Sequence, residues 1–196
     1  MHNRERVIVL RLIKHGEPDL VVQTLNRRGA RLSFFAKAAL KSKKRFGGGV
    51  LEPTHYIEVS YKERPNEELH TLLEAQLVQG FDGLRKDYDR LQTALYFLKI
   101  TSKLSQDGAV DSNDMFDLLG NALKAAEATS DVRRLRLHFE IKVLGYQGVL
   151  PALANSGQWM QKPLKDHGGL EIEKPELRQL EWEVHHRLES YLAGEG

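Results

Sequence analysis

The stretch Leu20–Ala36, LVVQTLNRRGARLSFFA, decides the fold that we predict for the first part of the chain. Two short runs rich in β-branched and aromatic residues, a composition typical of strands, flank Asn26-Arg27-Arg28-Gly29. Gly29 can adopt a positive φ at little steric cost, which suits a tight turn. The sequence therefore predicts a β-hairpin over these residues.

Three further strands are expected around this hairpin. Val7–Leu10, Tyr56–Tyr61 and Leu69–Ala75 have the same short, β-branched or aromatic texture. Five short antiparallel strands within about 75 residues are the size of a small closed barrel such as an OB-fold. An SH3-like barrel has a similar pattern, so the residues alone leave both folds open.

Beyond Val78 the pattern becomes helical. Apolar residues recur at three- and four-residue steps from Phe81 to about Ser105, where Gln106-Asp107-Gly108 interrupts them. We expect a second helix with Asp111 or Ser112 as its N-cap, a third from Asp131 to Leu144, and a last one that begins near Pro175. Residues 147–174 are expected to be irregular. We predict an α+β protein with a five-stranded, OB-fold-like barrel domain over residues 1–78 and a helical domain over residues 79–196.

Charge is distributed unevenly along the chain. Overall, 29 Lys and Arg residues oppose 27 Asp and Glu residues, a net charge of +2. Residues 1–64, however, hold 14 of these cations and only six of the acids, so the rest of the chain is net acidic. This distribution is typical of a basic binding region on an acidic body.

The composition also excludes several classes of site. The chain has no cysteine, which rules out disulfides, thiolate metal sites and a cysteine nucleophile and fits a reducing compartment. No segment approaches the ~20 apolar residues that span a bilayer, and the first residues are too charged for a signal peptide. We expect a cytoplasmic protein without membrane contact.

The basic stretch Ala36–Pro53, AKAALKSKKRFGGGVLEP, is the strongest functional signal. Its five cations come before any acid and repel one another, which favours binding of an external polyanion such as nucleic acid; they are Lys37, Lys41, Lys43, Lys44 and Arg45. The hairpin adds Arg27, Arg28 and Arg31. A solvated loop that only aids solubility has the same composition.

Aromatic residues interleave with these cations. Phe34, Phe35 and Phe46 could stack on bases, as aromatic side chains do in proteins that bind single strands. Strand alternation places Phe34 and Phe35 on opposite faces, so at most one of them is available. The residues alone do not say which.

Other motifs lack the partners that chemistry would need. Gly47-Gly48-Gly49 is not followed by the Gly-Lys-Ser/Thr of a phosphate-binding loop, and Glu17 and Asp19 have no third ligand nearby. His185 and His186 are adjacent on a helix and point about 100° apart, so they cannot share a metal. We therefore predict no catalytic residue and no metal site.

Arg133–Phe139, RRLRLHF, carries three cations on a predicted helix within the acidic part of the chain. Guanidinium groups beside Leu and Phe could hold an acidic peptide with an apolar end. An amphipathic helix with a charged solvent face explains the segment equally well.

Together these residues resemble the RecO family of bacterial recombinational-repair proteins. The similarity runs from VIVLRLIKHGEPDLVVQTLNRRGARLSFFAKAALKSKKRFGGGVLEP, residues 7–53, to HFEIKVLGYQGVLPAL, residues 138–153. Individual motifs are weak, but their order and spacing are fairly specific. The resemblance implies an N-terminal OB-fold, a helical C-terminal domain and no catalytic centre.

The resemblance also implies partners. RecO-like proteins bind single- and double-stranded DNA, anneal complementary strands and, with RecR, help load RecA onto strands coated by SSB, whose acidic tail docks in the helical domain. Carried over, the DNA contacts fall on Lys37, Lys41, Lys43, Lys44 and Arg45, with Arg27, Arg28 and Arg31 added from charge. The tail pocket falls near Arg134, Arg136, Phe139 and Leu144.

One departure concerns zinc. Many relatives carry a four-cysteine zinc module after the Pro-x-Leu segment, whereas residues 152–173 of this chain contain no cysteine. We expect no zinc or other cofactor, and packing by Trp159 in its place.

Two classes of function remain open. The first is a non-enzymatic DNA-binding and annealing mediator, which we expect to be associated with the nucleoid through its DNA. The second is an interaction scaffold whose basic face binds an acidic protein, because acidic peptides and phosphates attract the same cations.

Overall fold

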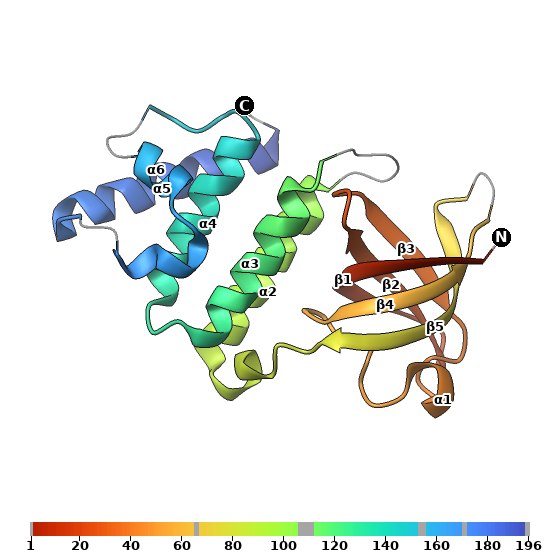
Figure 1. Cartoon of the computed structure of the whole chain (residues 1–196). Coiled ribbons are helices and arrows are strands. Elements are labelled where there is room, and N and C mark those ends of the chain that lie inside the picture. Colours follow the sequence, from red (N-terminus) through yellow and green to blue (C-terminus); the bar gives the residue numbers. More distant parts are fainter. Residues whose placement is uncertain (1, 65–66, 106–111, 153–155, 170–171, 195–196) are drawn as a thin grey trace. The chain divides into compact units, whose positions relative to one another are not determined.

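The computed structural model contains five strands, with one short helix between the third and fourth, and then further helices (Figure 1). It describes residues 2–64, 67–105, 112–152, 156–169 and 172–194. The strands are β1 (His2–His15), β2 (Asp19–Asn26), β3 (Arg31–Ala36), β4 (Tyr56–Lys62) and β5 (Leu69–Gln79). The helical elements are α1 (Lys43–Phe46), η1 (Asp82–Lys86), α2 (Tyr88–Leu104), α3 (Asp114–Ala128), α4 (Val132–Tyr146), α5 (Ser156–Gln161), η2 (Leu164–Gly169) and α6 (Lys174–Ala193). The predicted α+β class, with an OB-fold-like barrel before the helices, is confirmed.

The barrel closes in the order β1-β2-β3-β5-β4. β1 is longer than expected because its first half pairs with β4 and its second half with β2, both antiparallel. β3 and β5 pair in parallel, Ser33 opposite Leu69 and Phe35 opposite Thr71, so the expectation of purely antiparallel strands was wrong. The parallel pair lies between strands that are distant in sequence, a connection that strand patterning does not reveal.

Alternate residues of each strand fill the barrel. Val22, Phe34 and Ile57 are fully buried inside it. The β2–β3 turn is fixed by Asn26, whose buried side-chain oxygen accepts hydrogen bonds from the Arg28 and Ala30 amides at 3.0 and 2.9 Å. Gly29 has φ +77°, so the predicted hairpin is confirmed together with the reason for its glycine.

Helix boundaries differ from the prediction in detail. The predicted interruption at residues 106–108 and the candidate N-cap Asp111 lie outside the described residues. α3 begins at Asp114, whose amide donates to the Ser112 hydroxyl at 3.3 Å, and α4 extends to Tyr146 rather than Leu144. The prediction that residues 147–174 are irregular was wrong in part, because α5 and η2 lie there; both are too short to show periodicity.

Two compact units divide the chain. One comprises Met1–Asp82 with Leu98–Gly120, and the other Gly83–Phe97 with Asn121–Gly196. In the second unit, Phe97 and Phe139 pack with ring centroids 4.2 Å apart, and α4 contributes buried residues on most of its faces. No helix in the described parts of the chain is long and apolar enough to span a membrane.

Candidate nucleic-acid interface

The basic segment after β3 is a loop that contains α1, at one end of the barrel (Figure 1). Asp19, at the start of β2, accepts a hydrogen bond from the Ala38 amide at 2.7 Å. This bond supports the positive φ of Ala38, +54°, which turns the chain out of the strand. The Leu40 amide donates to the Pro18 carbonyl at 3.1 Å, so the β1–β2 turn also holds the loop in place.

The apolar residues of this loop close the end of the barrel. Ala39, Phe46 and Leu51 are buried and belong to the same core cluster as Phe34. Phe46 is therefore part of the core, and the suggestion that it might stack on bases was wrong. Because Ala39, Phe46 and Leu51 point into the barrel core, the loop presents its cations to solvent.

Four lysines of the loop are exposed: Lys37, Lys41, Lys43 and Lys44. Among the described residues, no carboxylate pairs with any of these ammonium groups. Arg45 differs, because its guanidinium donates to the Lys37 carbonyl at 2.7 Å and the Ser42 hydroxyl at 3.2 Å, and lies 5.0 Å from the Phe46 ring centroid. Arg45 therefore holds the loop together through these contacts, while the four lysines carry exposed charge without a carboxylate partner. We call this segment after β3, with its four exposed lysines, the lysine loop.

The hairpin cations lie elsewhere on the barrel. Leu20 pairs with Ala36 and Leu25 with Arg31, so the turn with exposed Arg27 and Arg28 lies one strand length, about 20 Å, from the start of the lysine loop. Arg31 is half-buried and donates to the Ser102 carbonyl at 3.2 Å. The structure thus separates two cationic groups that the sequence analysis had combined.

The two neighbouring phenylalanines are now distinguished. Phe34 is fully buried inside the barrel, with Tyr61 at a ring-centroid distance of 5.0 Å. Phe35 is half-buried on the outer face of the sheet. The sequence contained this answer, because the polar residues Arg31 and Ser33 share the alternation of Phe35.

The predicted peptide-docking residues are dispersed. Phe139 and Leu144 have no exposed surface, so they form core rather than a pocket wall. Arg134 pairs with Asp131, whose carboxylate caps α4 by accepting from the Arg134 amide at 3.0 Å. Of the four residues, Arg136 lines the surface groove between α4 and α6.

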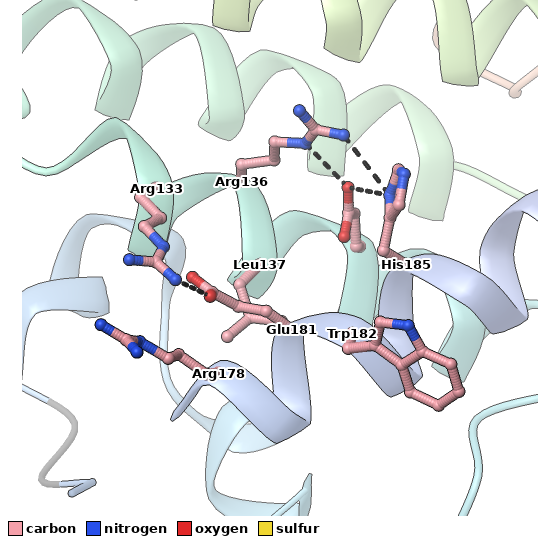
Figure 2. Close-up of a pocket in the computed structure, with 8 residues that line it drawn as sticks. Arg133, Arg136, Leu137, Arg178, Glu181, Trp182 and His185 are labelled. Atoms are coloured by element: carbon pink, nitrogen blue, oxygen red, sulfur yellow. Dashed lines mark hydrogen bonds and ion pairs between the residues drawn. The ribbon is translucent and has the colours of Figure 1, made fainter. Parts of the chain in front are cut away.

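That groove runs between α4 and α6 and has a volume of about 360 Å³. Figure 2 shows Arg133, Arg178 and Glu181 toward one end of it and Arg136 and His185 toward the other. Trp182 supplies exposed apolar surface, because it is 67% exposed and its ring stacks on His186 at 5.3 Å, whereas Leu137 lines the groove but is only 2% exposed. Sequence analysis missed Arg178, Trp182 and His185 because α6 is some forty residues beyond α4 in the chain.

Glutamates partly neutralise the groove. Glu181 pairs with Arg133, and the buried Glu140 accepts from Arg136 at 2.9 Å and from the Tyr96 hydroxyl at 2.5 Å. Burial, and then the Glu140 charge, raise the pKa of Tyr96, so this hydroxyl stays protonated. Among the described lining residues, Arg178 has no carboxylate partner and is the groove's available cation.

Comparisons with known proteins identify the chain. The family model "Recombination protein O N terminal" matches residues 1–81, and "Recombination protein O C terminal" matches residues 85–165.

The chain belongs to the RecO family.

Curated relatives agree with this assignment. The "DNA repair protein RecO" of Anaeromyxobacter dehalogenans is 34% identical over 146 residues, which are 74% of this chain and 57% of that protein. The protein of the same name from Syntrophus aciditrophicus is 30% identical over 74% of this chain and 55% of its own length. That of Thermodesulfovibrio yellowstonii is 29% identical over 83% of this chain and 64% of its own length. The chain thus spans little more than half the length of most of these relatives.

The zinc module of many RecO-like proteins does not fit this chain. There is no cysteine, and no cluster of three His, Asp or Glu side chains suited to a metal exists among the described residues. The corresponding segment, α5 with η2, is held against α4 by hydrogen bonds. His138 Nε2 lies 2.6 Å from the Trp159 carbonyl oxygen, and the Lys142 ammonium donates to the Met160 carbonyl at 2.7 Å. Trp159 is 1% exposed, as expected if it anchors this region.

A second histidine completes this fastening. His167 is buried, with ring nitrogens 2.7 Å from the Thr129 hydroxyl and 2.8 Å from the Leu164 carbonyl. Burial, together with the charges of Lys142 and His167, lowers the pKa of His138 to about 4. His138 is therefore neutral near pH 7 and acts as a hydrogen-bonding core residue.

Proposed function

We propose that this chain is a non-enzymatic, DNA-binding mediator of recombinational repair. It binds single- and double-stranded DNA through a barrel domain, residues 1–78, and anneals complementary strands. Its helical domain, residues 79–196, recruits protein partners. The site of action is the cytoplasm, at the nucleoid.

The lysine loop is the observation that carries the proposal. Lys37, Lys41, Lys43 and Lys44 are exposed on one loop and have no acidic partners among the described residues. Like charges held together in this way are relieved by a phosphate backbone, and each contact releases counterions. Backbone contacts of this kind bind DNA without reading its sequence, as an annealing protein requires.

The separation of the two cationic groups supports annealing. Arg27 and Arg28 lie about 20 Å along the hairpin from the lysine loop, far enough for each group to contact a different backbone. Holding two strands near each other raises their effective concentration, and base pairing then proceeds without a catalytic residue. Turnover of nucleotide by the pure protein would contradict the non-enzymatic part of the proposal.

The groove between α4 and α6 supports partner recruitment. Arg178 can pair with a carboxylate, while Trp182 offers apolar surface to a neighbouring side chain. An acidic peptide with an apolar end, as in the tail of SSB, suits this combination. With RecR, such recruitment would assist RecA loading onto SSB-coated single strands.

Charge reversal of the loop tests the DNA interface. Four lysine contacts to a single strand predict a slope of about −2.8 for log K against log salt, at about −0.7 per phosphate. Lys41→Glu/Lys43→Glu/Lys44→Glu should lower affinity strongly and flatten the slope by about 2. The matched control reverses three exposed lysines of the helical elements, Lys124, Lys165 and Lys174, and has the same net charge.

Two outcomes would contradict the proposal. Unchanged DNA affinity in the loop variant would favour the alternative, an interaction scaffold whose basic face binds an acidic protein. An equal loss in the control would show that overall charge, rather than this loop, governs binding.

A further inference from the structure

The outer face of β1, β2 and β3 carries a row of three apolar side chains. Ile13 pairs with Val21, and Val21 pairs with Phe35, so the three lie side by side across the sheet. All three are half-buried. The next position along this row, on β5, is Thr71.

The Phe35 ring is held but not stacked. Its one aromatic neighbour among the described residues is His15, with ring centroids 5.6 Å apart and planes at 86°. A perpendicular neighbour fixes the orientation of a ring without covering it as a parallel partner would. The apolar row thus ends in an oriented aromatic ring at the surface.

The charges around this row favour an anionic ligand. Exposed Arg11 lies on β1 two residues before Ile13, on the same face as the row, and exposed Lys37 follows β3 at the start of the lysine loop. The opposing charges are Asp19, whose carboxylate is engaged with the Ala38 amide, and Glu17 in the exposed turn. A strand whose phosphates follow the lysines would therefore bring its bases over the row.

We infer that Ile13, Val21 and Phe35 form a platform on which an unpaired base stacks against the Phe35 ring. This inference rests on the proposed function and adds a preference to it: phosphate contacts accept any nucleic acid, whereas the platform accepts only bases that are not stacked within a duplex. The platform gives the chain a means of favouring single strands.

Two oligonucleotides with equal charge test the platform. Wild-type protein should bind oligo(dT) on the order of tenfold more tightly than an abasic oligonucleotide of the same length, as stacking of one base predicts. Phe35→Ala should remove this difference and leave the abasic affinity unchanged, and Phe35→Trp should restore it. Leu40→Ala, at an apolar residue that is 56% exposed and lies four residues after β3, is the matched control and should behave as wild type.

The outcomes separate the two ideas. If the wild type binds both oligonucleotides with equal affinity, the platform is refuted while DNA binding stands; if it binds neither, the proposed function fails. Phe35→Trp in a Trp182→Phe background gives a second readout, because the fluorescence that it adds to that of Trp159 should be quenched by oligo(dT) and not by the abasic strand. Quenching by both strands alike, or by neither, would overturn the inference.

Discussion

The stability of the helical unit should depend on pH through His138. This residue is fully buried and bonds the Trp159 carbonyl through Nε2, and no partner for Nδ1 lies among the described residues. Protonation would place a charge in this core beside Lys142 and His167. The fold therefore holds His138 in its neutral form.

The sign follows from the two pKa values. The unfolded chain takes up a proton as the pH falls below 6.5, whereas the folded chain does so only near 4. Between these values the unfolded state binds more protons, so acidification destabilises the fold. Lowering the pH from 7.5 to 5 should remove about 2 kcal/mol of unfolding free energy, and full titration about 3 kcal/mol.

Urea unfolding measures this contribution. In a Trp182→Phe background the fluorescence reports on Trp159, whose ring lies 5.3 Å from His138. His138→Gln keeps a donor for the carbonyl but cannot titrate. Between pH 7.5 and 5 its unfolding free energy should therefore fall by about 2 kcal/mol less than that of the parent. His186→Gln, at an exposed histidine of α6, should follow the parent at each pH. An equal pH dependence in His138→Gln and parent would refute the reasoning.

Three substitutions should lower stability, each for a different reason. Gly47→Ala should cost about 1–3 kcal/mol, because the new Cβ would overlap the Lys43 carbonyl oxygen and displace the loop; thermal unfolding and limited proteolysis would detect this. Phe46→Ala should cost about 3 kcal/mol in urea unfolding, since it empties the end of the barrel. Tyr96→Phe should cost about 1.5–3 kcal/mol in the same assay, because the buried Glu140 loses a hydrogen-bond donor.

Each of these substitutions has a control. Gly157→Ala meets no atom within 4 Å and should be nearly neutral. Leu40→Ala removes a largely exposed side chain and should change stability little compared with Phe46→Ala. Tyr88→Phe alters a hydroxyl on a side chain that is 71% exposed. Losses in the controls equal to those in the three variants would show that the named contacts are not responsible.

Local patterns predicted the barrel well. The turn Asn26–Gly29 and the alternation of β2 and β3 need only neighbouring residues, so they could be read directly. The same hairpin shows that the turn arginines and the loop lysines lie at opposite strand ends, and the sequence analysis overlooked this. The parallel pairing of β3 with β5 depends on the closed barrel as a whole and has no local signal.

The helical part was harder to predict at the level of the site. Phe139 and Leu144 were assigned to a pocket by the family resemblance, but α4 is surrounded by α5, η2 and α6 and buries even Glu140 and Lys142. The groove depends on side chains of α6 that meet α4 only in the folded chain. A helix packed on several sides shows weak amphipathicity, so its exposed face could not be read from periodicity.

The parallel joining of β3 to β5 also has a consequence for biosynthesis. The first three strands leave the ribosome well before residues 69–79, and until then β3 has an unpaired edge and Phe34 lacks part of its cover. Unpaired edges beside exposed apolar side chains promote aggregation. We expect the nascent chain to be most dependent on chaperones during the interval between synthesis of Ala36 and emergence of Gln79.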